Sequence, residues 1–325
     1  MVGRAPVERG GTVTLPGHEV EGELVRVAIT GASGFIGSAL AADLEGDGHE
    51  VRRVGRSASG PGAIRWDPAA GVLDASALEG VDAVVHLAGE GIADKRWSDE
   101  QKRRIRDSRV ASTTLLAEAL AGLDAKPAVL VSGSGIDAYG DRGDEVLTER
   151  SSRGSTFLAD VVRDWEEATA PAEAAGIRVA LLRTSIVLDR RGGALPRMLS
   201  LARFGLLGRI GSGRQWWSWI TLADQLRAIR HLFDADVSGP VNLCAPNPVT
   251  NAEFTRAVGQ ALGRPTFLPV PAFAPKLLLG AELAETLLLE SKRAVPEQLQ
   301  QSGFRFQHET IDAALQAVLH AQPPT

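Results

Sequence analysis

The stretch Gly31-Ala32-Ser33-Gly34-Phe35-Ile36-Gly37 decides the fold of this 325-residue chain. It comes directly after the apolar run 26–30 and opens an amphipathic segment, 36–44, whose apolar residues recur at a spacing of four. Glycines between a strand and a helix let the chain turn tightly, approach a pyrophosphate and pack the helix on the strand. We therefore predict a dinucleotide site here, with an ordinary strand–turn–helix corner as the alternative. The residues expected to contact the dinucleotide are Gly31, Ser33, Gly34, Phe35, Ile36 and Gly37.

Short apolar runs alternate with longer segments of helical periodicity on both sides of this turn. This alternation predicts successive strand–helix–strand units around a buried parallel sheet, a Rossmann-type doubly wound α/β fold. The expected strands are 26–30, 51–54, 83–88, 128–132 and 178–183, and the longest expected helix is 99–120.

The regular alternation ends near residue 188 and gives way to a stretch rich in glycine and tryptophan. We therefore predict an N-terminal extension at 1–24 and an NAD(P)-binding Rossmann domain at 25–188. A smaller, mainly helical substrate-binding part follows at 189–325, and a strand at 240–245 returns from it to the Rossmann domain.

Composition and charge restrict the partners. The 35 basic and 40 acidic residues are mixed along the chain, which disfavours nucleic acid and membrane surfaces and leaves a small-molecule substrate. The lone Cys244, with no apolar run of signal-peptide or membrane-spanning length, predicts a cytoplasmic protein. The six histidines show no metal-ligand spacing, so no metal is expected. The sequence leaves the oligomeric state open.

The end of the second expected strand bears on the choice of cofactor. An NAD-preferring protein usually places Asp or Glu there to accept hydrogen bonds from the adenosine ribose. This chain has Arg56 and Ser57, which suit a 2′-phosphate by charge and by bidentate donation. We predict NADP(H) rather than NAD(H); the alternative is that Arg56 is a solvated loop charge.

Several further motifs carry a resemblance to a known group of proteins. The first set is Thr30–Gly37, His86-Leu87-Ala88-Gly89 and Val131-Ser132-Gly133-Ser134. These motifs resemble the extended short-chain dehydrogenase/reductase superfamily, in its NAD(P)-dependent epimerase/dehydratase branch. A narrower set is Arg96-Trp97, Ser108-Arg109, Tyr139–Glu145, Trp165-Glu166, Gly211–Gln215 and Ala245–Asn251. With these, the chain looks like the "epimerase family protein" group, once labelled cell-division-inhibitor-like, over residues 25 to 318.

The resemblance implies roles for two further segments. Leu87, Ala88 and Gly89 would lie beside the adenosine and ribose of the cofactor. Ser134 matches the family's catalytic serine or threonine, whose hydroxyl orients and polarises a substrate carbonyl or alcohol. A turn serine that only caps a strand end is the alternative.

The superfamily also places a Tyr four residues before a Lys on the helix after the serine strand. Lys and the cofactor ribose lower the pKa of that phenol until it exchanges a proton at neutral pH. This chain has no such pair: the corresponding helix contains 157–163, and the single tyrosine is Tyr139. Tyr139 follows Ser134 by five residues and is the remaining candidate proton donor.

Tryptophans gather in the glycine-rich loop after the Rossmann segment. Trp216, Trp217 and Trp219 follow Arg214 directly, which predicts a ligand lid or partner surface, with a hydrophobic plug between the two parts as the alternative. We predict Trp216 and Trp219 as substrate contacts, and Arg214 as the residue that meets an anionic substrate group.

The sequence thus predicts an NADP(H)-dependent oxidoreductase or epimerase-like enzyme that acts on an unknown small polar substrate. The rival is a catalytically silent NADP(H)-binding sensor or partner-binding protein. The missing Tyr–Lys pair favours the sensor, and the polar and aromatic loop 214–219 favours the enzyme.

Overall fold

A computed structural model describes residues 24–56, 62–266 and 268–320. The predicted N-terminal extension, apart from residue 24, and Ser57 therefore lie outside the described residues. The centre of the molecule is an eight-stranded sheet in the order β13-β8-β6-β5-β1-β2-β3-β4. Only the pair β3–β4 is antiparallel within this sheet. Its strands are β1 (Arg26–Thr30), β2 (Glu50–Gly55), β3 (Ile64–Asp67), β4 (Val72–Leu73), β5 (Ala83–His86), β6 (Val129–Gly135), β8 (Arg178–Thr184) and β13 (Gly239–Leu243).

The strand order reverses direction at β1. Strands β2 and β3 follow on one side of β1, whereas β5, β6 and β8 follow on the other. In such a doubly wound sheet a ligand crevice forms beyond the carboxyl ends of the strands at this switch point. The predicted Rossmann-type fold is confirmed.

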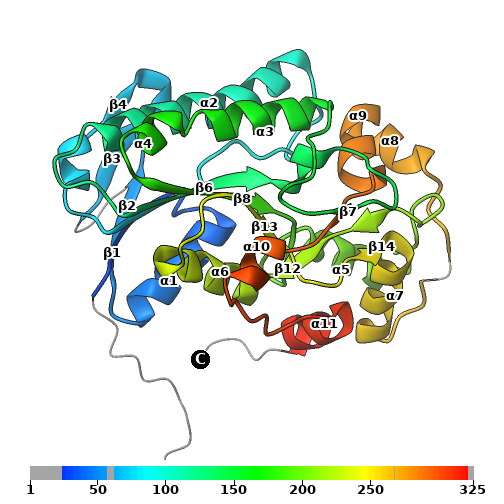
Figure 1. Ribbon diagram of the computed structural model, residues 1–325. Helices are drawn as coiled ribbons and strands as arrows, with labels where there is room; N and C mark the ends of the chain where they lie inside the picture. Colours follow the sequence, from blue (N-terminus) through cyan, green and yellow to red (C-terminus); the bar gives the residue numbers. More distant parts are fainter. Residues whose placement is uncertain (1–23, 57–61, 267, 321–325) are drawn as a thin grey trace, which may run out of the picture.

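Helices cover both faces of the sheet, because residues along a buried strand alternate between the two faces (Figure 1). Val27 and Ile29 of β1 pack in one core with helices α1 and α6, and Ala28 packs in the other with α2 and α4. The helices are α1 (Phe35–Gly46), α2 (Asp99–Ala121), α3 (Phe157–Glu167), α4 (Ala170–Ala174) and α6 (Leu222–Asp234). Helix α2 begins after Ser98, whose hydroxyl accepts from the Gln101 N–H at 3.2 Å.

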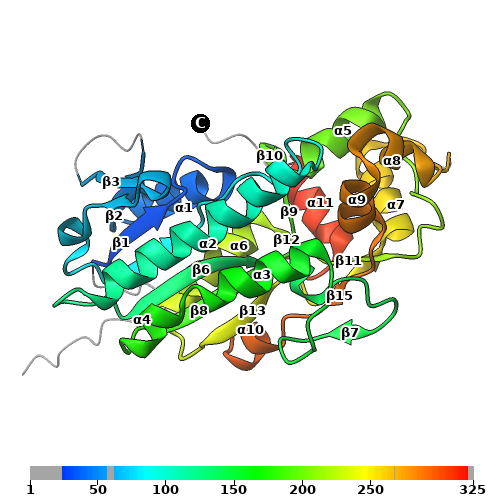
Figure 2. The same cartoon turned by 90° about the horizontal axis from the view of Figure 1, so that it is seen from above.

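Most segments after residue 185 build a second part at one end of the sheet (Figure 2), whereas α6 covers the sheet, β13 belongs to it and α10 (Glu297–Gln301) packs on β13. The helices of the second part are α5 (Leu195–Arg203), α7 (Asn251–Leu262), α8 (Phe273–Leu279), α9 (Ala281–Ala284), a π-helical turn (Glu285–Leu289) and α11 (Ile311–His320). Its short strands are β9 (Ile186–Asp189), β10 (Gly192–Gly193), β11 (Trp216–Trp217), β12 (Trp219–Thr221) and β14 (Val249–Thr250).

The two parts are joined by more than one crossing of the chain. Strand β13, which overlaps the predicted returning segment 240–245, pairs with β8 in the large sheet. Further along, β15 (Arg293–Ala294) pairs with β7 (Val146–Leu147), which follows β6 in the chain. The C-terminal segment is thereby held next to the carboxyl end of β6.

Candidate functional site

The glycine-rich turn lies directly against the chain that leaves β5. Gly31 has φ +69°, and a Cβ there would stand 2.8 Å from the backbone carbon of Leu87 and 2.9 Å from the nitrogen of Ala88. Neither the backbone conformation nor the space admits a side chain. The turn therefore has to be glycine at this position for β1 and β5 to end side by side.

The other two glycines bring α1 onto the turn. A Cβ at Gly37 would lie 2.2 Å from the Gly31 oxygen, so the first turn of α1 packs on the backbone. Gly34 stands at the N-cap, where its Cβ would be 3.2 Å from the same oxygen. Because Gly34 carries no side chain to cap the helix, the first N–H groups of α1 can serve an anionic ligand.

The remaining predicted cofactor residues meet the turn in different ways. Ser33 is exposed, whereas Phe35 and Ile36 are half-buried and pack against the sheet core. Phe35 also faces the second part, since a Cβ at Gly192 would be 2.4 Å from its ring. Thr30 pairs with Val54 and His86, so Arg56 and the Leu87–Gly89 segment leave the sheet at the same edge as the turn. Arg56 is exposed there.

The side chain of a buried histidine, His86, connects the carboxyl ends of β1 and β5 by hydrogen bonds. The His86 ring lies 2.7 Å from the Thr30 hydroxyl and 2.9 Å from the Thr113 hydroxyl. Thr30 Oγ1 also accepts from the N–H groups of Leu87 and Ala88. Burial lowers the pKa of His86 to about 4, so the ring is neutral and serves packing.

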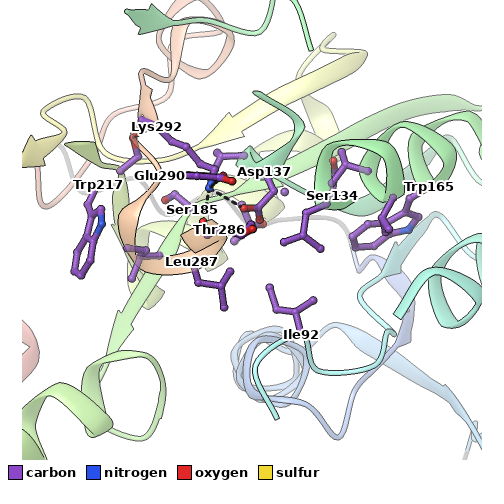
Figure 3. A pocket seen from close by; sticks show the side chains of 18 of the residues that line it. Ile92, Ser134, Asp137, Trp165, Ser185, Trp217, Thr286, Leu287, Glu290 and Lys292 are labelled. Carbon is purple, nitrogen blue, oxygen red and sulfur yellow. Dashed lines mark hydrogen bonds and ion pairs between the residues drawn. The ribbon is translucent and has the colours of Figure 1, made fainter. Parts of the chain in front are cut away.

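A cavity of about 280 Å³ opens beyond the carboxyl ends of β6 and β8, where the second part covers them (Figure 3). Its polar lining comes from several distant segments. These residues include Arg109, Ser134, Asp137, Ser185, Trp216, Thr286, Glu290 and Lys292. A site between strand ends and a second part is the usual position for a ligand in this architecture.

Ser134 lines the cavity but its proton is already engaged. Its hydroxyl donates to Glu166 Oε1 at 2.6 Å. Glu166 is 2% exposed and is held by Arg183 through contacts of 2.9 Å to each carboxylate oxygen, and by Arg153 at 2.6 Å. Since a hydroxyl has one proton and two lone pairs, Ser134 faces a ligand as an acceptor. This geometry suits a substrate hydroxyl better than the expected polarisation of a carbonyl.

Tyr139, the candidate proton donor from the sequence, is not among the residues that line the cavity. Its side chain is fully buried, and its hydroxyl donates to Asn242 at 2.7 Å and accepts from Arg183 at 3.1 Å. Burial raises the pKa of Tyr139 to about 12. The short 3-10 turn Ile136–Tyr139 that follows β6 carries the ring under the sheet edge, so Tyr139 is a structural residue.

The glycine- and tryptophan-rich loop is divided between the cavity and the core. Trp216 lines the cavity, and its indole N–H donates to Asp144 at 2.8 Å. Trp219 is fully buried with Phe254 in the core of the second part, because β12 pairs with β9 there. Arg214 is exposed and is not among the cavity residues. The predicted substrate roles of Trp219 and Arg214 are therefore not supported.

A charged cluster that the sequence reading missed stands at one side of the cavity. Lys292 Nζ lies 3.1 Å from Asp137 Oδ1 and 2.7 Å from Glu290 Oε2, and it donates to the Thr286 carbonyl at 2.8 Å. Burial alone would lower the pKa of Lys292, but the two carboxylates raise it above its ordinary value. Burial also raises the pKa of Glu290. No local spacing links Asp137 to residues 290–292, so only the β7–β15 pairing reveals the cluster.

Helix α3 corresponds to the helix on which the superfamily places its Tyr–Lys pair, but in this chain it contributes apolar side chains to the cavity wall. Leu158 and Val162 are four residues apart and both line the cavity. The proton-transfer groups of this cavity must therefore come from elsewhere.

A doubly wound sheet with a glycine turn at its switch point and a cavity beyond the strand ends defines a dinucleotide-binding protein of the Rossmann class. Residues 27–244 match the model of the NAD dependent epimerase/dehydratase family, and residues 270–318 match a domain of unknown function, DUF1731. The chain belongs to the NAD dependent epimerase/dehydratase family, and the resemblance inferred from its motifs is confirmed. Glu290 and Lys292 fall in the second matched region.

Individual relatives span nearly the whole chain. An epimerase family protein of Mycobacterium bovis is 47% identical over 291 residues, which are 89% of this chain and 96% of the relative. The crystal structure of human epimerase family protein SDR39U1 (isoform 2) with NADPH superimposes with a TM-score of 0.84 at 34% identity, covering 92% of this chain and 100% of that chain. A nucleoside-diphosphate sugar epimerase from Corynebacterium glutamicum gives a TM-score of 0.76 at 40% identity, over 91% of this chain and 58% of that one.

Within residues 24–56, 62–266 and 268–320, no helix combines the length and the apolar character that crossing a membrane requires.

Proposed function

We propose that the chain binds NADP(H) across the turn 31–37 and is an enzyme that acts on a small polar substrate in the cavity beyond β6. Three features support this cofactor: the glycine geometry of the turn, the N–H groups at the start of α1 that no side chain caps, and Arg56, which directly follows β2. The human relative solved with NADPH, at 34% identity, supports the same choice. When bound, NADP(H) supplies or accepts a hydride.

The observation that carries the enzyme proposal is the charged cluster inside a small, covered cavity. Desolvated ionisable groups that converge on a cavity are typical of catalytic sites. A cavity of about 280 Å³ also lies below the usual size for drug-sized ligands, which favours a small substrate.

The residues of the cavity can divide the proton chemistry among them. Ser134 accepts a hydrogen bond from a second hydroxyl or N–H group of the substrate and so orients it, because the single proton of the reacting hydroxyl goes to Asp137. Lys292 already contacts three oxygen atoms, so it fixes the two carboxylates rather than reaching the substrate. Asp137, which is 20% exposed, can then exchange a proton with the substrate oxygen. Glu290 neutralises Lys292 on the other side of the cluster, at 2.7 Å, and so holds the ammonium group in place.

One observation favours the rival function of a silent NADP(H)-binding sensor. The apolar pair Leu158 and Val162 leaves the α3 wall without proton-transfer groups. A sensor must bind NADP⁺ and NADPH with different affinities, because only a differential affinity shifts a conformational equilibrium.

Turnover of NADPH or NADP⁺ with a panel of small carbonyl and alcohol compounds tests the proposal. With an active compound, Asp137→Asn should lower turnover by roughly 10²–10⁴-fold, because it removes a positioned acid–base group. NADPH affinity, measured by tryptophan quenching, should change little. Asp160→Asn is the control, since Asp160 is an exposed carboxylate on α3 paired with Arg163.

Full turnover by Asp137→Asn would contradict the acid–base role of Asp137. A panel without any turnover, together with clearly different affinities for NADP⁺ and NADPH, would contradict the enzyme and favour the sensor.

A further inference from the structure

Arg109 is built into the wall of the cavity. It comes from α2, and its guanidinium carbon lies 5.1 Å from the centre of the Trp165 ring. It also lies against Gly89, where a Cβ would be 3.3 Å from the same carbon. Its Nη1 donates to the carbonyls of Glu90 and Ile105 at 2.9 and 3.0 Å. Stacking and these hydrogen bonds hold the guanidinium in one orientation.

The charge of Arg109 is not balanced by direct contact with a carboxylate. Arg109 and Lys292 are the cations that line the cavity, and Lys292 is ion-paired with Asp137 and Glu290. None of the ion pairs in the described part of the chain includes Arg109. Burial lowers the pKa of Arg109 to about 10, which still leaves it charged at neutral pH. The charges of Asp137 and Glu90 offset part of this desolvation, but neither carboxylate makes an ion pair with Arg109, so a ligand anion in direct contact would stabilise its charge further.

The hydrogen bonds of Arg109 leave donors for such a ligand. Those described for this side chain use Nη1 alone, so Nε and Nη2 keep their N–H groups. Together these two nitrogens form the planar fork that binds a carboxylate or phosphate at two points.

The lysine cluster and Trp165, the ring beneath Arg109, stand at different sides of the cavity. In Figure 3, Lys292 and Glu290 stand at one side, Trp165 stands at the other, and Ser134 lies between Asp137 and Trp165. Trp165 in turn packs on the strand beside Ser134, since a Cβ at Gly133 would be 2.8 Å from its ring. A small molecule with an anionic end on Arg109 would therefore carry its other end past Ser134 toward Asp137.

We propose that Arg109 binds an anionic group of the substrate, a carboxylate or a phosphate, and that the substrate class is small anionic hydroxy or carbonyl compounds. This inference rests on the proposed function, because it takes the cavity as the substrate site. It replaces Arg214, the residue expected from the sequence, with Arg109, whose motif Ser108-Arg109 carried the family resemblance but predicted no role in binding.

The test is the thermal unfolding temperature of the full chain titrated with malonate and with inorganic phosphate, against chloride at equal ionic strength. NADP⁺ is kept at saturation so that the phosphate turn is filled. We expect a saturable stabilisation of the wild type by malonate, phosphate or both. Arg109→Gln should weaken that binding tenfold to a hundredfold, roughly the effect of losing charge-assisted hydrogen bonds. Arg109→Lys should restore part of it, and Arg214→Gln, the control, should leave it unchanged.

Three outcomes would overturn the inference. The first is the absence of any saturable anion effect in the wild type, and the second is equal anion binding by wild type and Arg109→Gln. The third is a loss of NADPH affinity in Arg109→Gln with anions competing against NADPH, which would assign Arg109 to a cofactor phosphate. Failure of the proposed function is separately visible: if NADP⁺ does not bind, the anion titration of the free protein still measures the role of Arg109.

Discussion

The glycine turn 31–37 and the cavity lie at the same edge of the sheet, but they are built in opposite ways. The turn consists of backbone, and its shape depends on glycines within a stretch of seven residues that pack on the chain after β5. The cavity consists of side chains drawn from α2, β6, α3, β11 and the segment that ends at Lys292. A backbone site can therefore be predicted from local spacing, whereas a side-chain site depends on which distant segments the fold brings together.

The two regions also differ in what stabilises them. Steric necessity fixes the turn, since a Cβ at Gly31 or Gly37 would overlap backbone atoms. Buried charge pairs fix the cavity: Glu166 with Arg183 behind Ser134, and Lys292 with Asp137 and Glu290. Substitutions in the turn should therefore affect cofactor binding, while substitutions behind the cavity should affect the stability of the fold.

The largest expected effect is on the free energy of unfolding, when Glu166, the carboxylate that binds the Ser134 hydroxyl, is removed. Glu166→Ala leaves Arg183, which is 2% exposed, without its carboxylate, and it should lower the free energy of unfolding by about 3–5 kcal/mol. Urea unfolding followed by circular dichroism measures this. Glu167→Ala, its exposed neighbour, is the matched control and should stay within about 0.5 kcal/mol. Equal effects of the two variants would show that the pair behind Ser134 does not stabilise the fold.

The second effect separates binding from folding in the turn. Gly34→Val should weaken NADPH binding by at least ~100-fold, about 2.7 kcal/mol, because the branched side chain occupies the approach of the pyrophosphate. The fold should survive, since the added Cβ meets only the Gly31 oxygen, at 3.2 Å. Gly46→Ala, at the other end of α1 and in open space, is the control. Retained NADPH binding in a folded Gly34→Val protein would mean that the cofactor lies elsewhere.

The smallest effect concerns the choice between the two nicotinamide cofactors. NADPH should bind more tightly than NADH by about 1.5–3 kcal/mol, roughly one to two decades, and Arg56→Ala should remove most of this preference. Titrations by tryptophan quenching measure both affinities. Arg53→Ala is the control, because Arg53 on the same strand is paired with Glu45. A preference that Arg56→Ala leaves unchanged would assign the selectivity to other residues.

Most of the sheet could be predicted from the sequence, because buried parallel strands are continuous apolar runs whose ends are marked by glycine or charge. The run 26–30 became β1 without a shift, and 178–183 became β8 with one residue added. Ser134 was also reached, through the motif that ends β6, although its hydroxyl proved to be bound to Glu166.

The roles of the remaining site residues could not be predicted from short patterns along the chain. Tyr139 and Trp219 looked available for chemistry because aromatic side chains with polar atoms serve equally well in sites and in cores. The turn after β6 buried the first, and the β12–β9 pairing buried the second. Arg214 looked suited to an anion by its charge, yet it is exposed. Arg109, one of several charged residues on α2, lines the cavity instead.

By itself, the sequence determined the doubly wound sheet and the glycine turn, because both depend on backbone geometry and on apolar periodicity within a few tens of residues. The tertiary structure alone decided which charged side chains face the cavity. The pairing of β15 with β7 brings Lys292 within 3.1 Å of Asp137, across 155 positions of the chain. The physical reason is that ion pairing and desolvation depend on the distance between side chains in space, and local spacing does not encode this distance for residues so far apart.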